Sequence, residues 1–72
     1  MDLIDFENEE TLSREAAAEK LRELADQLAR HNEVAFDNDG LKTKLKVPDE
    51  VTMSFEIEVG DEGCEIEVEI RW

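Results

Sequence analysis

The feature that most constrains this chain is the strict alternation of apolar and polar residues between Val51 and Trp72. Apolar side chains occupy every second position on both sides of a turn, Gly60-Asp61-Glu62-Gly63. A period of two places successive side chains on opposite faces of a strand. The pattern therefore predicts two half-buried strands, 51–59 and 64–72, joined as an antiparallel hairpin.

The same alternation predicts the register of this hairpin. Placing Val59 opposite Cys64 makes every apolar residue meet another apolar residue, which is the condition for one buried face. On the outer face this register opposes carboxylates in two pairs, Glu56 with Glu67 and Glu58 with Glu65. Like charges directly opposed destabilise a sheet by roughly a few tenths of a kcal/mol each.

Two shorter segments with alternating residues, 33–37 and 41–47, predict a second hairpin. Between them lies Asp37-Asn38-Asp39-Gly40, a strong turn signal because glycine tolerates a positive φ.

A short turn, Pro48-Asp49-Glu50, follows the second of these strands and leads into strand 51–59. We therefore expect strands 41–47 and 51–59 to pair. This pairing would set Lys42, Lys44 and Lys46 on the outer face beside the strand of Glu56, where they compensate its negative charge.

Residues 14–31 have the pattern of an amphipathic helix, with an apolar stripe at Ala17, Leu21, Leu24 and Leu28. Ser13 is a favourable N-cap, and Asn32 can adopt the left-handed conformation that ends a helix. Before the helix, residues 2–7 alternate and predict a short N-terminal strand.

These segments predict a single α+β domain over residues 1–72. One N-terminal strand and one helix would pack on a four-stranded antiparallel meander with strands 33–37, 41–47, 51–59 and 64–72. A domain of this size buries only about 60% of its unfolded surface. The predicted core is Ile4, Phe6, Leu21, Leu24, Leu28, Phe36, Leu45, Met53, Phe55, Ile57, Ile66, Val68 and Ile70.

The charge of the chain excludes several kinds of partner. Acidic residues number 21 and basic residues 8, which gives a net charge of −13. Nucleic-acid binding by phosphate neutralisation needs a basic face, and so does binding to anionic lipid, so we expect neither partner. No apolar run approaches a membrane span, the first residues do not resemble a signal peptide, and one cysteine forms no internal disulfide. These features predict a reducing, cytoplasmic location.

No residue pattern indicates catalysis, a cofactor or a metal. With this many carboxylates, acidic pairs arise by chance. We expect His31 to be an exposed imidazole near the helix C-terminus and Cys64 to be a buried structural thiol. The turn before Gly40 is superficially similar to a calcium loop, but that alignment puts Ala35 and Lys46 at the terminal ligand positions. We therefore expect no enzyme activity.

Two features are candidates for interaction. Trp72 has the inward parity, so it either plugs the end of the sheet against the helix or anchors a partner or a second copy. The outer face carries a row of acidic residues that is either a solvated surface or a polyanionic mimic. That row is Glu56, Glu58, Glu65, Glu67 and Glu69.

Three parts of the chain together resemble the amphi-Trp domain. They are the two alternating strands ending in Trp72, the stretch Leu12-Ser13-Arg14-Glu15-Ala16-Ala17 and the segment Val47-Pro48-Asp49-Glu50-Val51. The resemblance covers nearly the whole chain. It implies a small, often stand-alone domain, common in salt-loving archaea, and it supplies no catalytic residues.

We accordingly expect a non-enzymatic, acidic protein-interaction or self-associating module adapted to a high-salt cytoplasm, with a homodimer among the options. The alternative is a polyanionic mimic that binds a basic, nucleic-acid-binding surface of another protein. The sequence does not identify the partner, the pathway or the oligomeric state.

Overall fold

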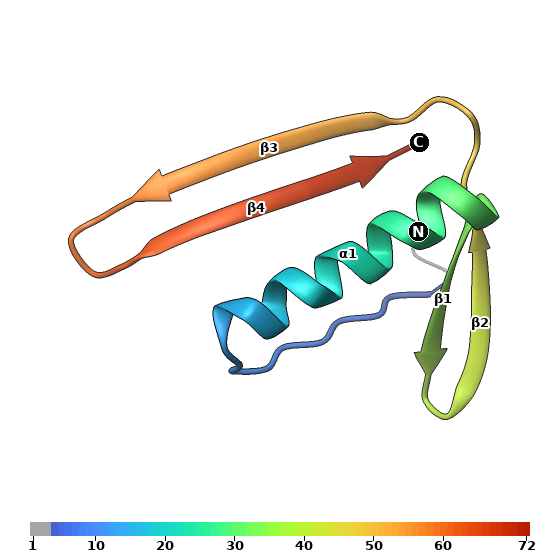
Figure 1. Cartoon of the computed structure of the whole chain (residues 1–72), viewed down its shortest axis with the longest axis horizontal. Coiled ribbons are helices and arrows are strands. Elements are labelled where there is room, and N and C mark those ends of the chain that lie inside the picture. The colour runs from blue at the N-terminus through green and yellow to red at the C-terminus, as the bar shows by residue number, and fades with distance from the viewer. Residues whose placement is uncertain (1–3) are drawn as a thin grey trace.

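The computed structural model describes residues 4–72, in which one helix is followed by four strands (Figure 1). The elements are α1 (Arg14–His31), β1 (Glu33–Asn38), β2 (Leu41–Lys46), β3 (Thr52–Val59) and β4 (Cys64–Arg71). The strands form two separate antiparallel hairpins, β1–β2 and β3–β4. The predicted α+β class is therefore confirmed.

The helix begins and ends where its capping residues predict. The Ser13 side chain accepts a hydrogen bond of 3.1 Å from the Ala16 N–H, which satisfies one of the donors left free in the first turn. At the other end Asn32 has φ 54° and ψ 24°, the left-handed conformation that terminates helices. Both ends are thus fixed by local chemistry.

The first hairpin turns at Asp39 and Gly40, which have φ values of 54° and 82°. Positive φ at both central residues characterises the two-residue turn that matches the twist of a hairpin. Its register sets Val34 opposite Leu45 and Phe36 opposite Thr43. The predicted strands are confirmed to within a residue at their ends.

The second hairpin has the predicted register, with Val59 opposite Cys64 and Phe55 opposite Val68. The Gly60 N–H donates to the Gly63 carbonyl over 2.9 Å and closes the turn. The like-charged pairs of the outer face also occur as predicted, Glu56 with Glu67 and Glu58 with Glu65.

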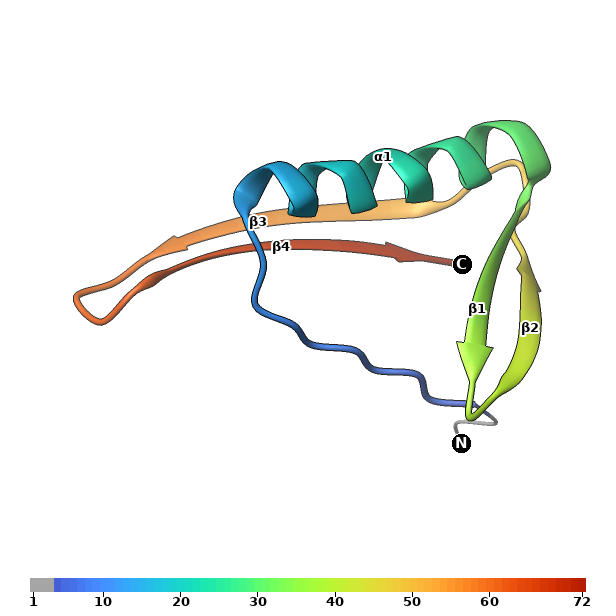
Figure 2. The same cartoon turned by 60° about the horizontal axis from the view of Figure 1, so that its bottom comes forward.

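The prediction of one continuous meander is wrong, because β2 and β3 do not pair. The Val47 N–H instead donates to the Asn32 carbonyl over 2.8 Å, which ties the end of the first hairpin to the end of α1. Pro48 follows and has no N–H with which to continue a ladder. The chain then turns away, and β3–β4 extends in a different direction from β1–β2 (Figures 1 and 2).

The predicted N-terminal strand is also wrong over residues 4–7, which pair with no strand; its residues 2 and 3 lie outside the described part. The Phe6 ring nevertheless lies against Phe36 of β1, with centroids 5.4 Å apart and planes tilted by 44°. The segment is therefore held by aromatic packing rather than by a hydrogen-bonded ladder.

The predicted core is wrong for a single chain, since no side chain among residues 4–72 is fully buried. Leu28, Phe36 and Ile70 are half-buried, and the other predicted core residues are exposed. The cause is that no Cα of α1 lies within 8 Å of a Cα of β3 or β4, so the helix covers only the first hairpin. The radius of gyration is 14.1 Å, against about 11 Å for a compact chain of this length.

Candidate functional site

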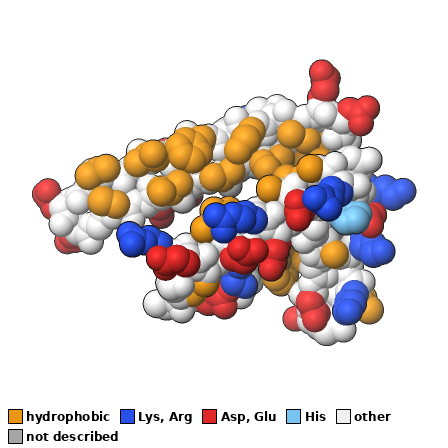
Figure 3. Space-filling view, in the orientation of Figure 1, with side chains coloured by type: hydrophobic (Ala, Val, Ile, Leu, Met, Phe, Trp, Pro, Cys, Tyr) orange, Lys and Arg blue, Asp and Glu red, His pale blue; other side chains and the backbone are white. Residues whose placement is uncertain are grey.

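The most distinctive surface is the apolar face of the β3–β4 hairpin, here called the hairpin face. Alternation along both strands, in the observed register, brings these side chains to one side (Figure 3). Val51 and Trp72 flank it at the end of the hairpin where the strands meet the rest of the chain. The hairpin face comprises Met53, Phe55, Ile57, Val59, Cys64, Ile66, Val68 and Ile70.

The hairpin face is open to solvent from the turn to Met53 and Val68, and Ile70 at its other end is half-buried. Phe55 is 62% exposed, Ile66 68% and Val59 78%. Apolar patches on isolated soluble proteins are usually small, and larger ones mark interaction sites. A lone two-stranded hairpin is also marginally stable in water, so this face needs something to cover it.

Trp72 follows β4 and is 56% exposed. With more than half of its surface exposed, it is not a buried plug at the end of the sheet, which was one of the two predicted roles. Its indole is instead available beside the hairpin face.

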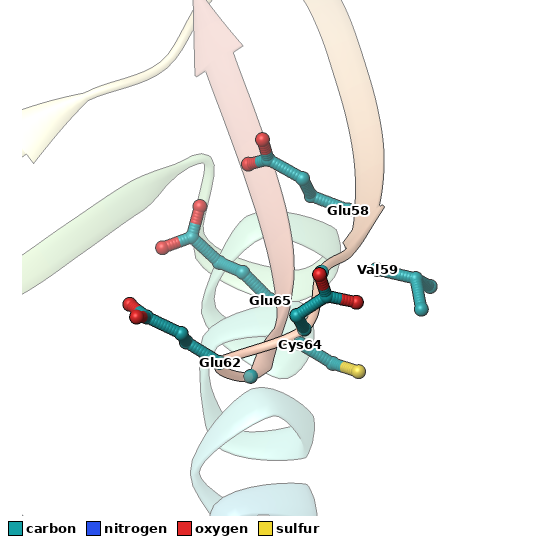
Figure 4. Close-up of a pocket in the computed structure, with 8 residues that line it drawn as sticks. Glu58, Val59, Glu62, Cys64 and Glu65 are labelled. Atoms are coloured by element: carbon teal, nitrogen blue, oxygen red, sulfur yellow. The ribbon is translucent and has the colours of Figure 1, made fainter.

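Cys64 is exposed, which corrects the prediction of a buried structural thiol. Its parity was predicted correctly, since Cys64 and Val59 point to one side of the hairpin end while Glu58 and Glu65 point to the other (Figure 4). The thiol therefore belongs to the hairpin face, and it is exposed together with its neighbours Val59 and Ile66.

The outer face of the same hairpin carries the predicted acidic row. Arg71 donates to Glu69 and, over 3.2 Å, to the Ser54 hydroxyl, so one carboxylate of the row is paired with a cation. Within residues 4–72 no lysine or arginine lies within 4.0 Å of the other members, Glu56, Glu58, Glu65 and Glu67.

The positive charges of the β2 lysines are compensated by carboxylates of β1 and not, as predicted, by those of the strand of Glu56. Lys42 and Lys46 lie opposite Asp37 and Glu33 of β1, and Lys44 lies 3.7 Å from Glu33. The predicted neighbourhood with Glu56 is wrong because β2 and β3 are not paired. The acidic row consequently receives no cation from β2.

A groove that sequence reasoning missed lies between the N-terminal segment, α1 and the first hairpin. Phe6, Leu24 and Phe36 supply apolar lining, and Lys20 and Lys44 also line the groove. The Lys20 ammonium lies 2.8 Å from a Glu10 carboxylate oxygen, and the hydrogen bond and charge of Glu10 raise the pKa of Lys20. The alternation of residues 4–7 was the available signal, but it indicated a strand rather than one wall of a groove.

The remaining features of residues 4–72 concern an imidazole, a metal site and a membrane-spanning helix. His31 is exposed in the last turn of α1, where it was expected. In the part of the chain that the structure describes, no three His, Cys, Asp or Glu side chains are grouped so as to hold a metal ion. Over the same residues, no helix combines the length and apolarity that a membrane crossing requires.

Comparison with known proteins connects this architecture to a family. No match was found among the curated proteins or among the solved structures. The Amphi-Trp domain, in contrast, matches residues 1–72, the whole chain. The amphipathic strands and the terminal tryptophan described above lie within that match. The chain therefore belongs to the Amphi-Trp domain family.

Proposed function

We propose that this chain is a non-enzymatic protein-interaction module of a high-salt cytoplasm, and that it binds through the hairpin face. The observation that carries the proposal is the exposure of that face, on which Met53, Phe55 and Ile57 are each at least 60% exposed. Its side chains are aliphatic, aromatic or sulfur-containing. Such groups contribute burial on binding, and the Cys64 thiol is the one group among them with acid, base or nucleophile chemistry.

The charge of the chain supports a high-salt setting. A net charge of −13 on 72 residues produces strong self-repulsion in dilute buffer. At 1 M salt the screening length falls to about 3 Å, and salts that are excluded from the surface strengthen apolar burial. High salt thus favours apolar docking of a chain whose charge would otherwise oppose association.

Site-specific photocrosslinking in cells that express the chain tests this proposal. A benzophenone side chain is placed at Met53, on the hairpin face, and in a matched variant at the neighbouring Ser54, on the outer face. We expect discrete protein adducts from position 53 in molar salt and few from position 54. Adducts from position 54 alone, or from neither position, would contradict the proposal.

The four carboxylates of the acidic row that have no cation partner support a second candidate function, a polyanionic mimic that occupies a basic nucleic-acid-binding surface of another protein. Glu56, Glu58, Glu65 and Glu67 face each other across the strands with no cation nearby among residues 4–72. Such a surface presents closely spaced negative charges, as a nucleic-acid backbone does.

Competition against duplex DNA for a basic DNA-binding domain distinguishes the two functions. A mimic displaces the DNA in dilute buffer, loses this ability as salt rises, and loses it when Glu56 and Glu67 become Gln. A module that binds through the hairpin face shows no such displacement. Its position-53 adducts persist in molar salt and are unaffected by Glu56→Gln.

A further inference from the structure

We infer that the occupant of the hairpin face is a second copy of this chain, packed face to face on the first. The inference rests on the proposed function, since it requires that the hairpin face is the contact surface, and it adds the identity of the partner. Three observations support it: the surface area of the chain, the placement of its charges, and the isolation of the β3–β4 hairpin.

The surface area of one chain is far larger than that of a folded monomer. The structure exposes 7027 Å², whereas a compact monomer of 8.3 kDa exposes about 4,600 Å². The excess of about 2,400 Å² per chain is spread over the whole chain, since Leu21 of α1 and Leu41 of β2 are also 60% and 69% exposed. A second copy on the hairpin face therefore recovers the part of this excess that the β3–β4 hairpin contributes.

The placement of charge favours a face-to-face pair. Every position of the hairpin face between Met53 and Ile70 is uncharged, while the acidic row occupies the opposite face. Two sheets packed on their apolar faces lie about 10 Å apart, and their outer faces then point away from each other into solvent. Face-to-face packing is thus the arrangement that buries both apolar surfaces while keeping the two acidic rows apart.

The isolation of the hairpin explains why the partner is a copy rather than an occasional ligand. No Cα of α1, β1 or β2 lies within 8 Å of a Cα of β3 or β4, and a hairpin on its own is marginally stable. A partner that completes the core must be present whenever the chain is made, and a second copy always is. The pair would bring Phe55, Ile57 and Ile66 of each chain into one shared core.

Sedimentation equilibrium of the purified chain in molar KCl tests the state of association. We expect a mass of twice 8.3 kDa over a wide range of protein concentration. The variant Phe55→Glu places a charge on the hairpin face and should dissociate the pair, whereas Glu56→Gln, one position along and on the outer face, should not. Phe55→Glu is also expected to unfold, because folding and association are coupled.

A second measurement keeps the test independent of that variant. Cys64 is the only cysteine of the chain and lies on the hairpin face. In molar salt its reaction with a maleimide should be at least about tenfold slower than in the matched variant Cys64→Ser/Glu65→Cys, since only opened pairs expose Cys64. The control thiol lies one position along β4 on the outer face and stays accessible.

The outcomes separate this inference from the proposed function. A folded monomer with a reactive Cys64 overturns the second copy but leaves the hairpin face free for another protein. A monomer with a protected Cys64 overturns both, because the face would then be covered within the chain. A dimer in which both thiols react alike, or an open-ended series of oligomers, overturns the face-to-face pair.

Discussion

Glu56 and Glu67 lie directly opposite each other on the outer face of β3–β4, with no cation from residues 4–72 within 4.0 Å. The neighbouring pair of Glu58 and Glu65 repeats this arrangement. Each opposed pair destabilises the hairpin by roughly a few tenths of a kcal/mol, and the net charge adds to this repulsion.

Stability should consequently depend on salt. We expect the free energy of unfolding, measured with urea at one protein concentration, to rise markedly between dilute buffer and molar KCl. The double variant Glu56→Gln/Glu58→Gln should gain roughly 0.5–1 kcal/mol in dilute buffer and show a smaller salt effect. Glu69→Gln is the matched control and should gain nothing, because Arg71 already compensates that carboxylate. A melting temperature of the natural chain that does not change with salt would contradict this prediction.

The contribution of the helix N-cap Ser13 to the free energy of unfolding should be measurable by itself. Ser13→Ala removes the acceptor for the Ala16 N–H and should lower the free energy of unfolding by about 1 kcal/mol. Ser13→Asp keeps an acceptor at the cap and should retain most of the stability. Thermal unfolding followed by circular dichroism at 222 nm, a standard helix signal, compares the three chains; equal losses in both variants would speak against capping as the cause.

The turn of the first hairpin depends on one glycine. Gly40 has φ +82°, and a Cβ built there meets nothing within 4 Å, so the cost of Gly40→Ala comes from the backbone alone. We expect a loss of about 1–2 kcal/mol. Gly60 is the control, since its Cβ would meet only the Gly63 carbonyl at 3.4 Å, an ordinary contact. Gly60→Ala should be neutral or slightly stabilising, and a larger loss there than at Gly40 would refute the assignment.

One side-chain hydrogen bond joins α1 to β1. The Ala35 N–H donates to the Gln27 side-chain carbonyl over 2.7 Å. Gln27→Met keeps the length of the side chain but removes the acceptor, and should cost about 1 kcal/mol. Gln27→Glu keeps the acceptor and should cost less. Hydrogen exchange at the Ala35 amide gives the direct readout, with faster exchange expected only in the methionine variant.

The pair of Lys20 and Glu10 predicts a specific alkaline titration. The hydrogen bond to Glu10 and its negative charge raise the pKa of Lys20. A raised folded-state pKa means that the stabilising contribution is complete below the unfolded-state pKa of about 10.4 and is lost as pH rises through the folded-state value. Glu10→Gln should return the pKa of Lys20 towards its ordinary value, measured by NMR titration of the side chain. An unchanged titration in that variant would show that Glu10 is not the cause.

The parts of the fold that sequence predicts are those decided by neighbouring residues. Ser13 and Asn32 determine the ends of α1 through bonds within a few residues, and Asp39 with Gly40 determines a turn through its own φ values. The register of β3–β4 follows from parity, because shifting it by one residue would put Glu56 among the apolar side chains.

The separation of the hairpins depends instead on a bond between distant residues. Val47 donates to Asn32, and nothing in the short Pro48 turn indicates whether the chain afterwards returns to β2 or leaves it. The core was mispredicted for a related reason. Alternation shows that Phe55 belongs to an apolar face. The alternating sequence is the same whether the chain's own helix or another molecule covers that face, so it does not identify what covers it.

The position of the Gly60–Gly63 turn has a consequence for how this protein can vary in length. The turn lies at the free end of the β3–β4 hairpin, away from α1 and the first hairpin (Figure 1). Adding two residues to each strand there would lengthen the hairpin and preserve both faces, whereas adding one residue to each would exchange the faces beyond the insertion. Natural length changes at this end should therefore occur in even steps per strand.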